Sequence, residues 1–382
     1  MSKKKLFLIH NHKNFSGAAR SLGETITFLK KKIDFVVICP KGTSSRFFKS
    51  LDVSVIEIIL VPRFNHFEIG YYKSWRWLLL IREAFAIFYF FFFLIYLKLK
   101  FIKISYFHLN EIELSIISPL LKFFFETKVT CHLRSPLEMK KGKLRYKFLK
   151  KICENYLDKI ISIDNDCFKT SPNKKNSVII YNGINKKNVD AKRKKRKTIT
   201  FGFVGNFIKR KGIYEALKVF MKIDGKLKAN LLCVGKNQIQ NRLLNMLKYE
   251  RDFESFLLKN QITKYKNIKI LPMTFNLKNF YSNIDIILFP GYMNAVGRPV
   301  IEAALLKKPS IIAMKNYNKD TAKKNNCLIF KPGNIVSLEQ KILYFLKNSS
   351  KIKKMGISAF NNAKKNFDIK KNSKTFCKVI WG

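Results

Sequence analysis

The chain has few acidic residues and no paired cysteines, and both absences exclude classes of protein. It carries 25 Asp and Glu against 75 Lys and Arg, a formal net charge of +50 over 382 residues. Its seven cysteines lie singly with no Cys-x-x-Cys spacing. The sequence therefore predicts neither a zinc site nor a disulfide framework, and buried thiols in a reducing cytoplasm are expected.

Long apolar runs are also scarce. The longest, Ala84 to Leu97, has 14 residues, whereas a helix that spans a bilayer needs about 20. Charged residues flank it on both sides, so we predict a buried or interfacial helix. The basic N-terminus lacks the apolar stretch of a signal peptide and predicts a first strand.

The excess of positive charge predicts anionic partners or reflects a lysine-rich composition, and the residues leave both readings open. The lysines are dispersed along the chain, and we find no zinc-finger spacing, RNP-like motif or helix-turn-helix pattern. We therefore expect no nucleic-acid partner, although a polyanion- or nucleic-acid-binding α/β protein stays as the alternative that charge alone supports.

Short apolar runs alternate with helical segments, which is typical of parallel βαβ units. In the first half we predict strands at Leu6–His10, Phe35–Cys39, Val53–Ile59, Ile104–Leu109, Val129–Leu133, Lys159–Ile163 and Val178–Asn185, with helices at Ala18–Lys30 and Glu113–Glu126. After a charged connector at Lys186–Lys197, we predict strands at Thr198–Val204, Asn230–Val234, Ile268–Leu271, Ile284–Phe289, Ser310–Ala313 and Cys327–Phe330. The helices predicted in this half are Ile213–Ile223, Arg242–Lys259, Val300–Leu306 and Leu338–Lys347.

This repetition predicts an α/β protein of two facing Rossmann-like domains with a deep cleft between them. We place the N-terminal, acceptor-side domain at residues 1–180 and a nucleotide-sugar-binding domain at residues 181–365. Residues 366–382 are predicted to form a C-terminal helix that packs back toward the first domain.

Two glycine-containing turns follow strands in positions suited to phosphate binding. In the segment from Phe203 to Gly212, glycine lets the backbone approach a phosphate, and Lys209, Arg210 and Lys211 could clamp a pyrophosphate. The N-terminal counterpart is Ser16-Gly17, for which an ordinary helix cap is the other reading.

A third segment, Phe289 to Ala313, combines a strand end, a glycine-containing loop and a helix start. Pro299 suits the first helical position, and Glu302 is then expected in the first turn. A carboxylate there is stabilised by the helix dipole. It could equally hold sugar or ribose hydroxyls at the carboxyl ends of the strands, where α/β sheets bind ligands.

Together these segments resemble the large retaining glycosyltransferase family of GT-B fold, family 4, which builds bacterial polysaccharides and glycolipids. The resemblance rests on collinear motifs: SGAARSL, PKG, FHLN, CHLR, YNGIN, FVGNFIKRKG, LLCVGKN, LPMTFNLKNFYSNIDIILFP and GRPVIEA. It covers most of the chain and implies a nucleotide-sugar donor bound by the C-terminal domain.

The resemblance also implies roles for particular residues. Lys211 corresponds to the lysine that contacts the diphosphate, Glu302 to the second Glu of an E-x7-E pair, and His132 to a histidine near the transferred sugar, so these three are the predicted catalytic residues. Asn294 stands where the family has its first Glu, and Asn206 where it has a basic residue. The predicted donor-binding residues are Ser16, Gly17, Gly205, Asn206, Lys209, Arg210, Asn294, Ala295, Gly297 and Arg298.

The implied activity is transfer of a sugar to a glycan or lipid-linked acceptor with retention, in biosynthesis of cell-surface polysaccharide such as capsule or lipopolysaccharide. No cofactor and no metal are expected. The basic amphipathic segment Lys140–Asp158 is either a core-facing helix or a helix on anionic lipid. We favour the second reading, hence a cytoplasmic protein peripheral to the inner membrane. A catalytically impaired GT-B relative and a sugar-nucleotide epimerase are the competing readings.

Overall fold

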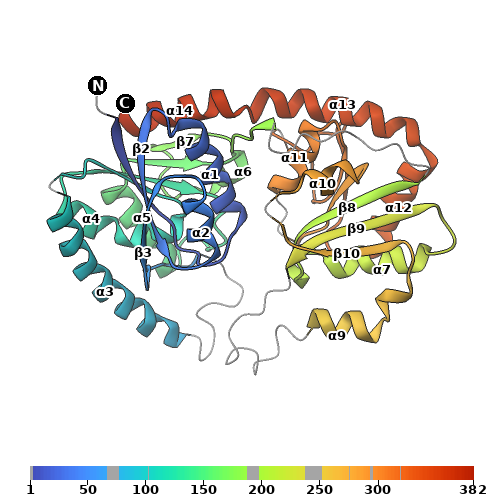
Figure 1. Ribbon diagram of the computed structural model, residues 1–382, viewed down its shortest axis with the longest axis horizontal. Helices are drawn as coiled ribbons and strands as arrows, with labels where there is room; N and C mark the ends of the chain where they lie inside the picture. Colours follow the sequence, from blue (N-terminus) through green and yellow to red (C-terminus); the bar gives the residue numbers. More distant parts are fainter. Residues whose placement is uncertain are drawn as a thin grey trace. The chain divides into compact units, whose positions relative to one another are not determined.

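The computed structural model describes residues 3–66, 77–101, 103–186, 198–236, 252–274, 276–292, 296–318 and 320–382. The chain divides into two compact units (Figure 1). Unit 1 comprises Met1–Ile184 and Asp368–Gly382, and unit 2 comprises Asn185–Phe367. The segment that returns to unit 1 therefore begins at residue 368, where the sequence predicts a boundary at 366.

Unit 1 is built on a seven-stranded parallel sheet of order β3-β2-β1-β4-β5-β6-β7. Its strands are β1 Lys4–Ile9, β2 Ile33–Pro40, β3 Ser54–Ile58, β4 Tyr106–Leu109, β5 Lys128–Leu133, β6 Lys159–Ser162 and β7 Ser177–Ile179. Its helices are α1 Gly17–Leu29, α2 Thr43–Lys49, α3 Leu79–Lys100, the 3₁₀ helix η2 Ile112–Ile117, α4 Ser118–Phe124, α5 Leu144–Tyr156, α6 Asn165–Thr170 and α14 Ile369–Trp381.

Strand alternation divides the core of unit 1 between the two faces of the sheet. Phe7 and Ile9 of β1 pack in a cluster with residues of α3, η2, α4 and α5, whereas Leu6 and Leu8 pack with residues of α1 and α14. Since successive side chains of a strand point to opposite faces, the near-continuous apolar strands require helices on both. Unit 1 is thus a three-layer α/β domain of Rossmann-like type.

Unit 2 repeats this architecture on a six-stranded parallel sheet of order β10-β9-β8-β11-β12-β13. Its strands are β8 Ile199–Asn206, β9 Ala229–Lys236, β10 Ile268–Pro272, β11 Ile286–Phe289, β12 Ser310–Ala313 and β13 Cys327–Phe330. Its helices are the 3₁₀ helices η4 Lys209–Lys211 and η5 Ile262–Lys264, together with α7 Ile213–Ile223, α9 Asp252–Lys259, α10 Lys278–Ser282, α11 Arg298–Leu305, α12 Ile335–Lys347 and α13 Ser349–Asn366. α7 and α12 pack on one face, α10 and α11 on the other.

A strand is present at every predicted position, although β7 ends at Ile179 and covers only the start of Val178–Asn185; the predicted fold class of two Rossmann-like domains is confirmed. Two helical segments differ from prediction by more than a shift of their ends. The segment Glu113–Glu126 is divided into η2 and α4, because Pro119 lacks an amide hydrogen and is accommodated in the first turn of a new helix. The apolar run Ala84–Leu97 belongs to a longer helix, α3, of 22 residues. The connector beyond Lys186 and the N-terminal part of the helix predicted at Arg242–Lys259 lie outside the described residues.

α3 is a long apolar helix on the outer side of unit 1, beside α4 (Figure 1). Among the residues that the structure describes, it alone is long and apolar enough to cross a membrane by length and composition. Only 28 % of its most apolar window is buried in the protein. The sequence predicted a buried or interfacial helix, and the first alternative holds for only this minor part of the helix surface.

Candidate functional site

In both sheets the strand order reverses beside the first strand of the unit. In unit 1 the chain passes from β1 outward to β3 on one side and from β4 to β7 on the other; in unit 2 the reversal lies between β8 and β11. At such a switch point the loops at the carboxyl ends of two neighbouring strands diverge and leave room for a ligand. The predicted site residues after β8 and β11 lie at this edge of unit 2.

The turn after β8 carries the basic residues and is held close to the turn after β11. Gly212, with φ of 75°, ends η4, and a Cβ atom there would lie 2.1 Å from the carbonyl oxygen of Pro290. The Tyr292 amide donates to the carbonyl oxygen of Arg210 at 3.0 Å. The sequence thus brings Lys209, Arg210 and Lys211 to the switch point because glycine allows two backbones to meet.

Tyr292 also ties this turn to the start of α7. Its hydroxyl donates to Oε1 of Glu215, which lies in the first turn of that helix and is buried. Burial, and then the Glu215 contact, raise the pKa of Tyr292 to about 12, so the phenol keeps its proton at neutral pH. Burial, and then the charge of Arg210, lower the pKa of Lys211 from its ordinary value. Tyr292 therefore connects the basic turn to the start of α7, and the Lys211 side chain is partly buried.

Glu302 lies differently from the prediction. α11 begins at Arg298, with Gly297 as N-cap and Pro299 as its second residue, so Glu302 falls in the second turn. Its side chain is 1 % exposed; Oε1 accepts from Nε of Arg298 at 2.7 Å and Oε2 from the Tyr281 hydroxyl at 2.5 Å. The expectation of a first-turn carboxylate stabilised by the helix dipole is wrong, because the helix starts one residue earlier. Glu302 is instead one half of a buried ion pair.

The other predicted donor-binding residues of unit 2 flank these turns. Gly205 and Asn206 end β8, in register with Gly235 and Lys236 of β9. A Cβ atom on Gly297 would lie 2.4 Å from the ring of Phe289, so glycine lets the loop cross that ring. Asn294 and Ala295 lie outside the described residues.

In unit 1, Ser16 is the N-cap of α1: its hydroxyl accepts from the Ala19 amide at 3.3 Å. Gly17 begins the helix and is exposed, with no atom within 4 Å of where its Cβ would be. These two residues make the ordinary helix cap that the sequence also allowed.

His132, at the end of β5, belongs to a buried polar chain that the sequence did not predict as a unit. Its Nδ1 lies 2.6 Å from Nε2 of His108 and 3.4 Å from Nη2 of Arg134, and Nδ1 of His108 lies 2.8 Å from the Thr130 hydroxyl. Arginine can only donate, which makes Nδ1 of His132 an acceptor and places its proton on Nε2. Burial, and then the charge of Arg134, hold the pKa of His132 well below its ordinary value, so the imidazole is neutral.

Arg134 connects this chain to the switch point of unit 1. It donates from Nε and Nη2 to Oδ1 of Asn110, at 3.0 and 2.6 Å, and from Nη1 to Oδ1 of Asn182 at 2.9 Å. The Asn110 amide nitrogen lies 2.9 Å from Nδ1 of His10. His10 follows β1 and Asn110 follows β4, the two strands at the reversal. The signal that could have identified them is their position at the carboxyl ends of two predicted strands, His10 as the last residue of one and Asn110 directly after the other.

A small cavity within unit 1 opens onto His132 and Arg134. Its other polar lining residues include Ser21, Thr25, Asn182 and Ser373. Burial raises the pKa of the nearby Glu111 to about 8 and that of Glu113 to about 7. Within the described part of the chain, no group of three or more His, Cys, Asp or Glu is placed to hold a metal ion.

The fold and these sites define the class: a two-domain α/β protein of GT-B architecture, with polar residues at the switch point of each sheet. Residues 185–362 match the model of the family described as glycosyl transferases group 1. The C-terminal half of the chain is thus similar to that family in sequence, in the unit that carries the basic turn and Glu302.

The chain is also similar in sequence or in structure to known glycosyltransferases and to HepE of Anabaena. Over 182 residues the chain is 25 % identical to the capsular polysaccharide biosynthesis glycosyltransferase CapM of Staphylococcus aureus, and the match covers 47 % of this chain and 43 % of CapM. HepE of Anabaena in complex with UDP-glucose superposes with a TM-score of 0.76 at 13 % identity over 98 % of each chain. A glycosyltransferase from Rickettsia africae superposes with a TM-score of 0.72 at 16 % identity over 100 % of this chain and 98 % of its own. These structural likenesses establish the GT-B fold.

Proposed function

We propose that the chain is a glycosyltransferase that moves a sugar from a nucleotide-sugar donor to a glycan or lipid-linked acceptor, with retention, in cell-surface polysaccharide biosynthesis. The observation that carries the proposal is the basic turn Lys209–Lys211, held against Pro290 and Tyr292 at the switch point of unit 2. It lies inside the segment that matches the group 1 family. The similarity to CapM and to HepE, which was solved with UDP-glucose, supports this donor class and this pathway.

The chemistry needs stabilisation of a leaving nucleoside diphosphate. The bond between the anomeric carbon and the diphosphate oxygen breaks, and negative charge develops on that oxygen. In this proposal Lys211 and Arg210 offset this charge, and no metal is invoked. The acceptor hydroxyl bonds to the anomeric carbon from the same face, and its proton passes to the departing phosphate oxygen.

Glu302 is proposed to hold donor hydroxyls, as the family resemblance implies. The Tyr281 hydroxyl and Nε of Arg298 both donate to its carboxylate and fix the orientation of that group.

The test is a thermal-shift screen of nucleotide sugars, followed by an assay for glycosylated product with the donor that stabilises the protein. We expect one nucleotide sugar to raise the melting temperature and to be consumed only when acceptor is present. Consumption without acceptor, with release of an altered sugar nucleotide, would indicate an epimerase. Binding without turnover would indicate a catalytically impaired relative, and stabilisation only by polyanions would overturn the proposal.

A further inference from the structure

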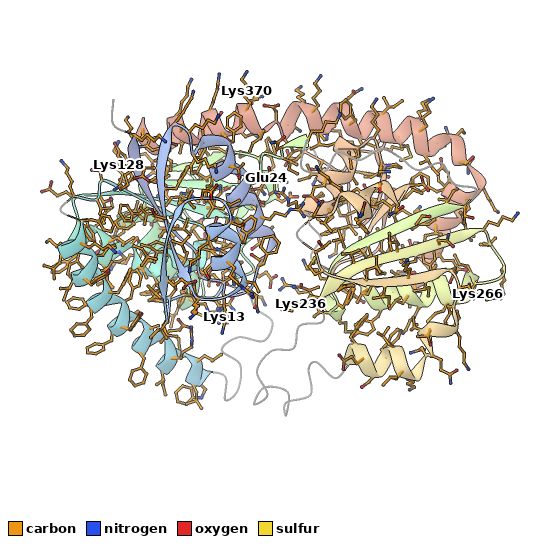
Figure 2. The ribbon with its side chains drawn as sticks, viewed as in Figure 1. Lys13, Glu24, Lys128, Lys236, Lys266 and Lys370 are labelled. Atoms are coloured by element: carbon orange, nitrogen blue, oxygen red, sulfur yellow. The ribbon has the colours of Figure 1, made fainter. Side chains whose placement is uncertain are left out.

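One face of α3 carries an unbroken apolar surface that no other part of the described structure covers. We define the α3 stripe as its exposed residues spaced alternately by three and four: Leu78, Ile81, Phe85, Phe88, Phe92, Ile95 and Leu99. Phe85 is 66 % exposed, Phe88 65 % and Leu99 82 %. This spacing keeps the seven side chains on one side of the helix over about 30 Å. Ring-bearing side chains project outward along this helix in Figure 2.

The opposite side of α3 is fixed to unit 1. Phe90, Phe93, Leu94 and Leu97 are part of the core cluster beneath the sheet. Near the start of the helix, buried Glu83 accepts from the Arg63 amide at 2.9 Å. Crossing a membrane would uncover this core and desolvate Glu83, so α3 lies along a surface with one side packed and the other exposed.

The charges around the stripe are of one sign. No charged residue occurs from Ala84 to Leu97; Arg82 and Glu83 precede this run, and Lys98 and Lys100 follow it. The single acid of the helix, Glu83, is buried and paired with Arg82 and Arg63. The exposed surface therefore consists of an apolar centre with basic ends.

Neighbouring helices on the same face of the sheet continue this pattern. α4 packs between α3 and α5 and exposes Phe123. On α5, Leu144 and Phe148 are exposed, whereas Leu149, Ile152 and Cys153 are buried. In the amphipathic segment Lys140–Asp158, the apolar residues at four-residue spacing are Leu144, Phe148, Ile152 and Tyr156, and three of these four are exposed. Exposed lysines surround the apolar residues of α5: Lys143, Lys147, Lys150 and Lys151.

We propose that the α3 stripe lies in the interface of a lipid bilayer with anionic headgroups, parallel to the membrane surface. Apolar side chains on one side of a helix bury in the acyl boundary, while lysine and arginine at its edges reach anionic headgroups. The basic ends of the stripe are complementary to that surface. A second copy of the chain is not, because α3 exposes no acid: parallel pairing of two stripes brings Lys98 and Lys100 against the same lysines, and antiparallel pairing offers them no carboxylate.

This inference is independent of the donor site and can be tested by flotation of the full chain with vesicles. Vesicles of phosphatidylcholine mixed with phosphatidylglycerol are compared with vesicles of phosphatidylcholine alone. We expect strong binding to the anionic vesicles that weakens as salt is raised. Combined substitution Phe85→Ser, Phe88→Ser and Phe92→Ser is expected to lower the bound fraction by about tenfold or more.

The matched control is a variant with the same number of exposed apolar side chains replaced in unit 2: Leu258→Ser, Val336→Ser and Ile357→Ser. It should bind vesicles as the unchanged protein does. A Phe88→Trp variant that still binds vesicles allows insertion to be measured by fluorescence. The emission of an indole that enters the bilayer shifts to shorter wavelength and is quenched by brominated lipid. Equal binding by both triple variants would overturn the proposal, as would unshifted indole emission from the Phe88→Trp variant on anionic vesicles. Dimerisation in the absence of lipid, lost only in the α3 variant, would assign the stripe to a second copy instead.

Discussion

Arg298 and Glu302 form a buried ion pair one turn apart on α11, with the Arg298 Nε 2.7 Å from Oε1 of Glu302. Removing one partner of such a pair leaves the other charge buried without compensation. Glu302 is therefore expected to contribute both to the stability of unit 2 and to the proposed binding of the donor. Experiments can measure the two contributions separately.

We predict that Glu302→Ala lowers transfer about tenfold or more and destabilises the protein by about 3–5 kcal/mol. Glu302→Gln keeps an acceptor for the Tyr281 hydroxyl and should recover part of the stability without recovering the activity. Denaturant unfolding and product formation are measured on the same preparations. Glu339→Ala, which removes a surface pair with Lys222 at 2.8 Å, is the control and should change stability by less than about 1 kcal/mol.

Lys211→Ala is expected to lower transfer about tenfold or more, because the departing diphosphate loses a cation that is close to it. Its effect on the melting temperature should be small, since burial already lowers the pKa of Lys211 and holding its charge there costs free energy. Lys218→Ala, on the exposed side of α7, is the control and should retain full activity. Near-normal turnover in both Lys211→Ala and Glu302→Ala would refute the site assignment.

Gly212→Ala tests the approach of the two turns at the switch point. The added Cβ would meet the carbonyl oxygen of Pro290 at 2.1 Å, in addition to the strain at φ of 75°. Gly225→Ala is a matched control, because Gly225 has φ of 69° and no atom within 4 Å of its Cβ position. We expect Gly225→Ala to cost about 1 kcal/mol in unfolding free energy. Gly212→Ala should cost about 1–3 kcal/mol more and weaken binding of the nucleotide sugar identified in the thermal-shift screen. Equal losses would mean that the turns do not constrain each other.

His108 predicts a pH dependence of stability in unit 1. Burial, and then the charge of Arg134, lower its pKa from 6.5 to about 3. Between these values the unfolded chain binds a proton that the folded chain does not, so stability falls as pH falls from 6.5 toward 3. The raised pKa values of Glu111 and Glu113 act in the opposite direction, because their folded carboxyls bind protons at higher pH than unfolded ones.

Comparison with a His108→Gln variant separates these effects, since both carboxyls remain. From pH 6.5 to pH 5 the unchanged protein should lose about 2 kcal/mol more than the variant, at about 1.4 kcal/mol per pH unit for one proton. Urea unfolding at several pH values gives the two curves. Parallel curves over this range would contradict a neutral, buried His108.

Much of the fold was predictable from local pattern. The strand cores at Ser310–Ala313 and Cys327–Phe330 and the helix Ile213–Ile223 have the predicted bounds, because runs of buried apolar residues have the same signature wherever the chain places them. Helix starts were less predictable: α11 begins one residue before Pro299, which moved Glu302 from the first turn to the second. Hydrophobic composition identified α3 as a helix but not which of its sides is covered, since almost every residue around it is apolar.

The sequence by itself determined the class of the protein: repeated buried strands and collinear turns specify two Rossmann-like domains with basic residues after β8. Only the tertiary structure decided which side chains meet. His10, His108, Asn110, Arg134 and Asn182 come from four segments and are joined at the carboxyl edge of one sheet, because parallel strands align their ends there. In the same way, only packing against the core of unit 1 leaves one side of α3 exposed, since burial depends on neighbours that a linear pattern does not name.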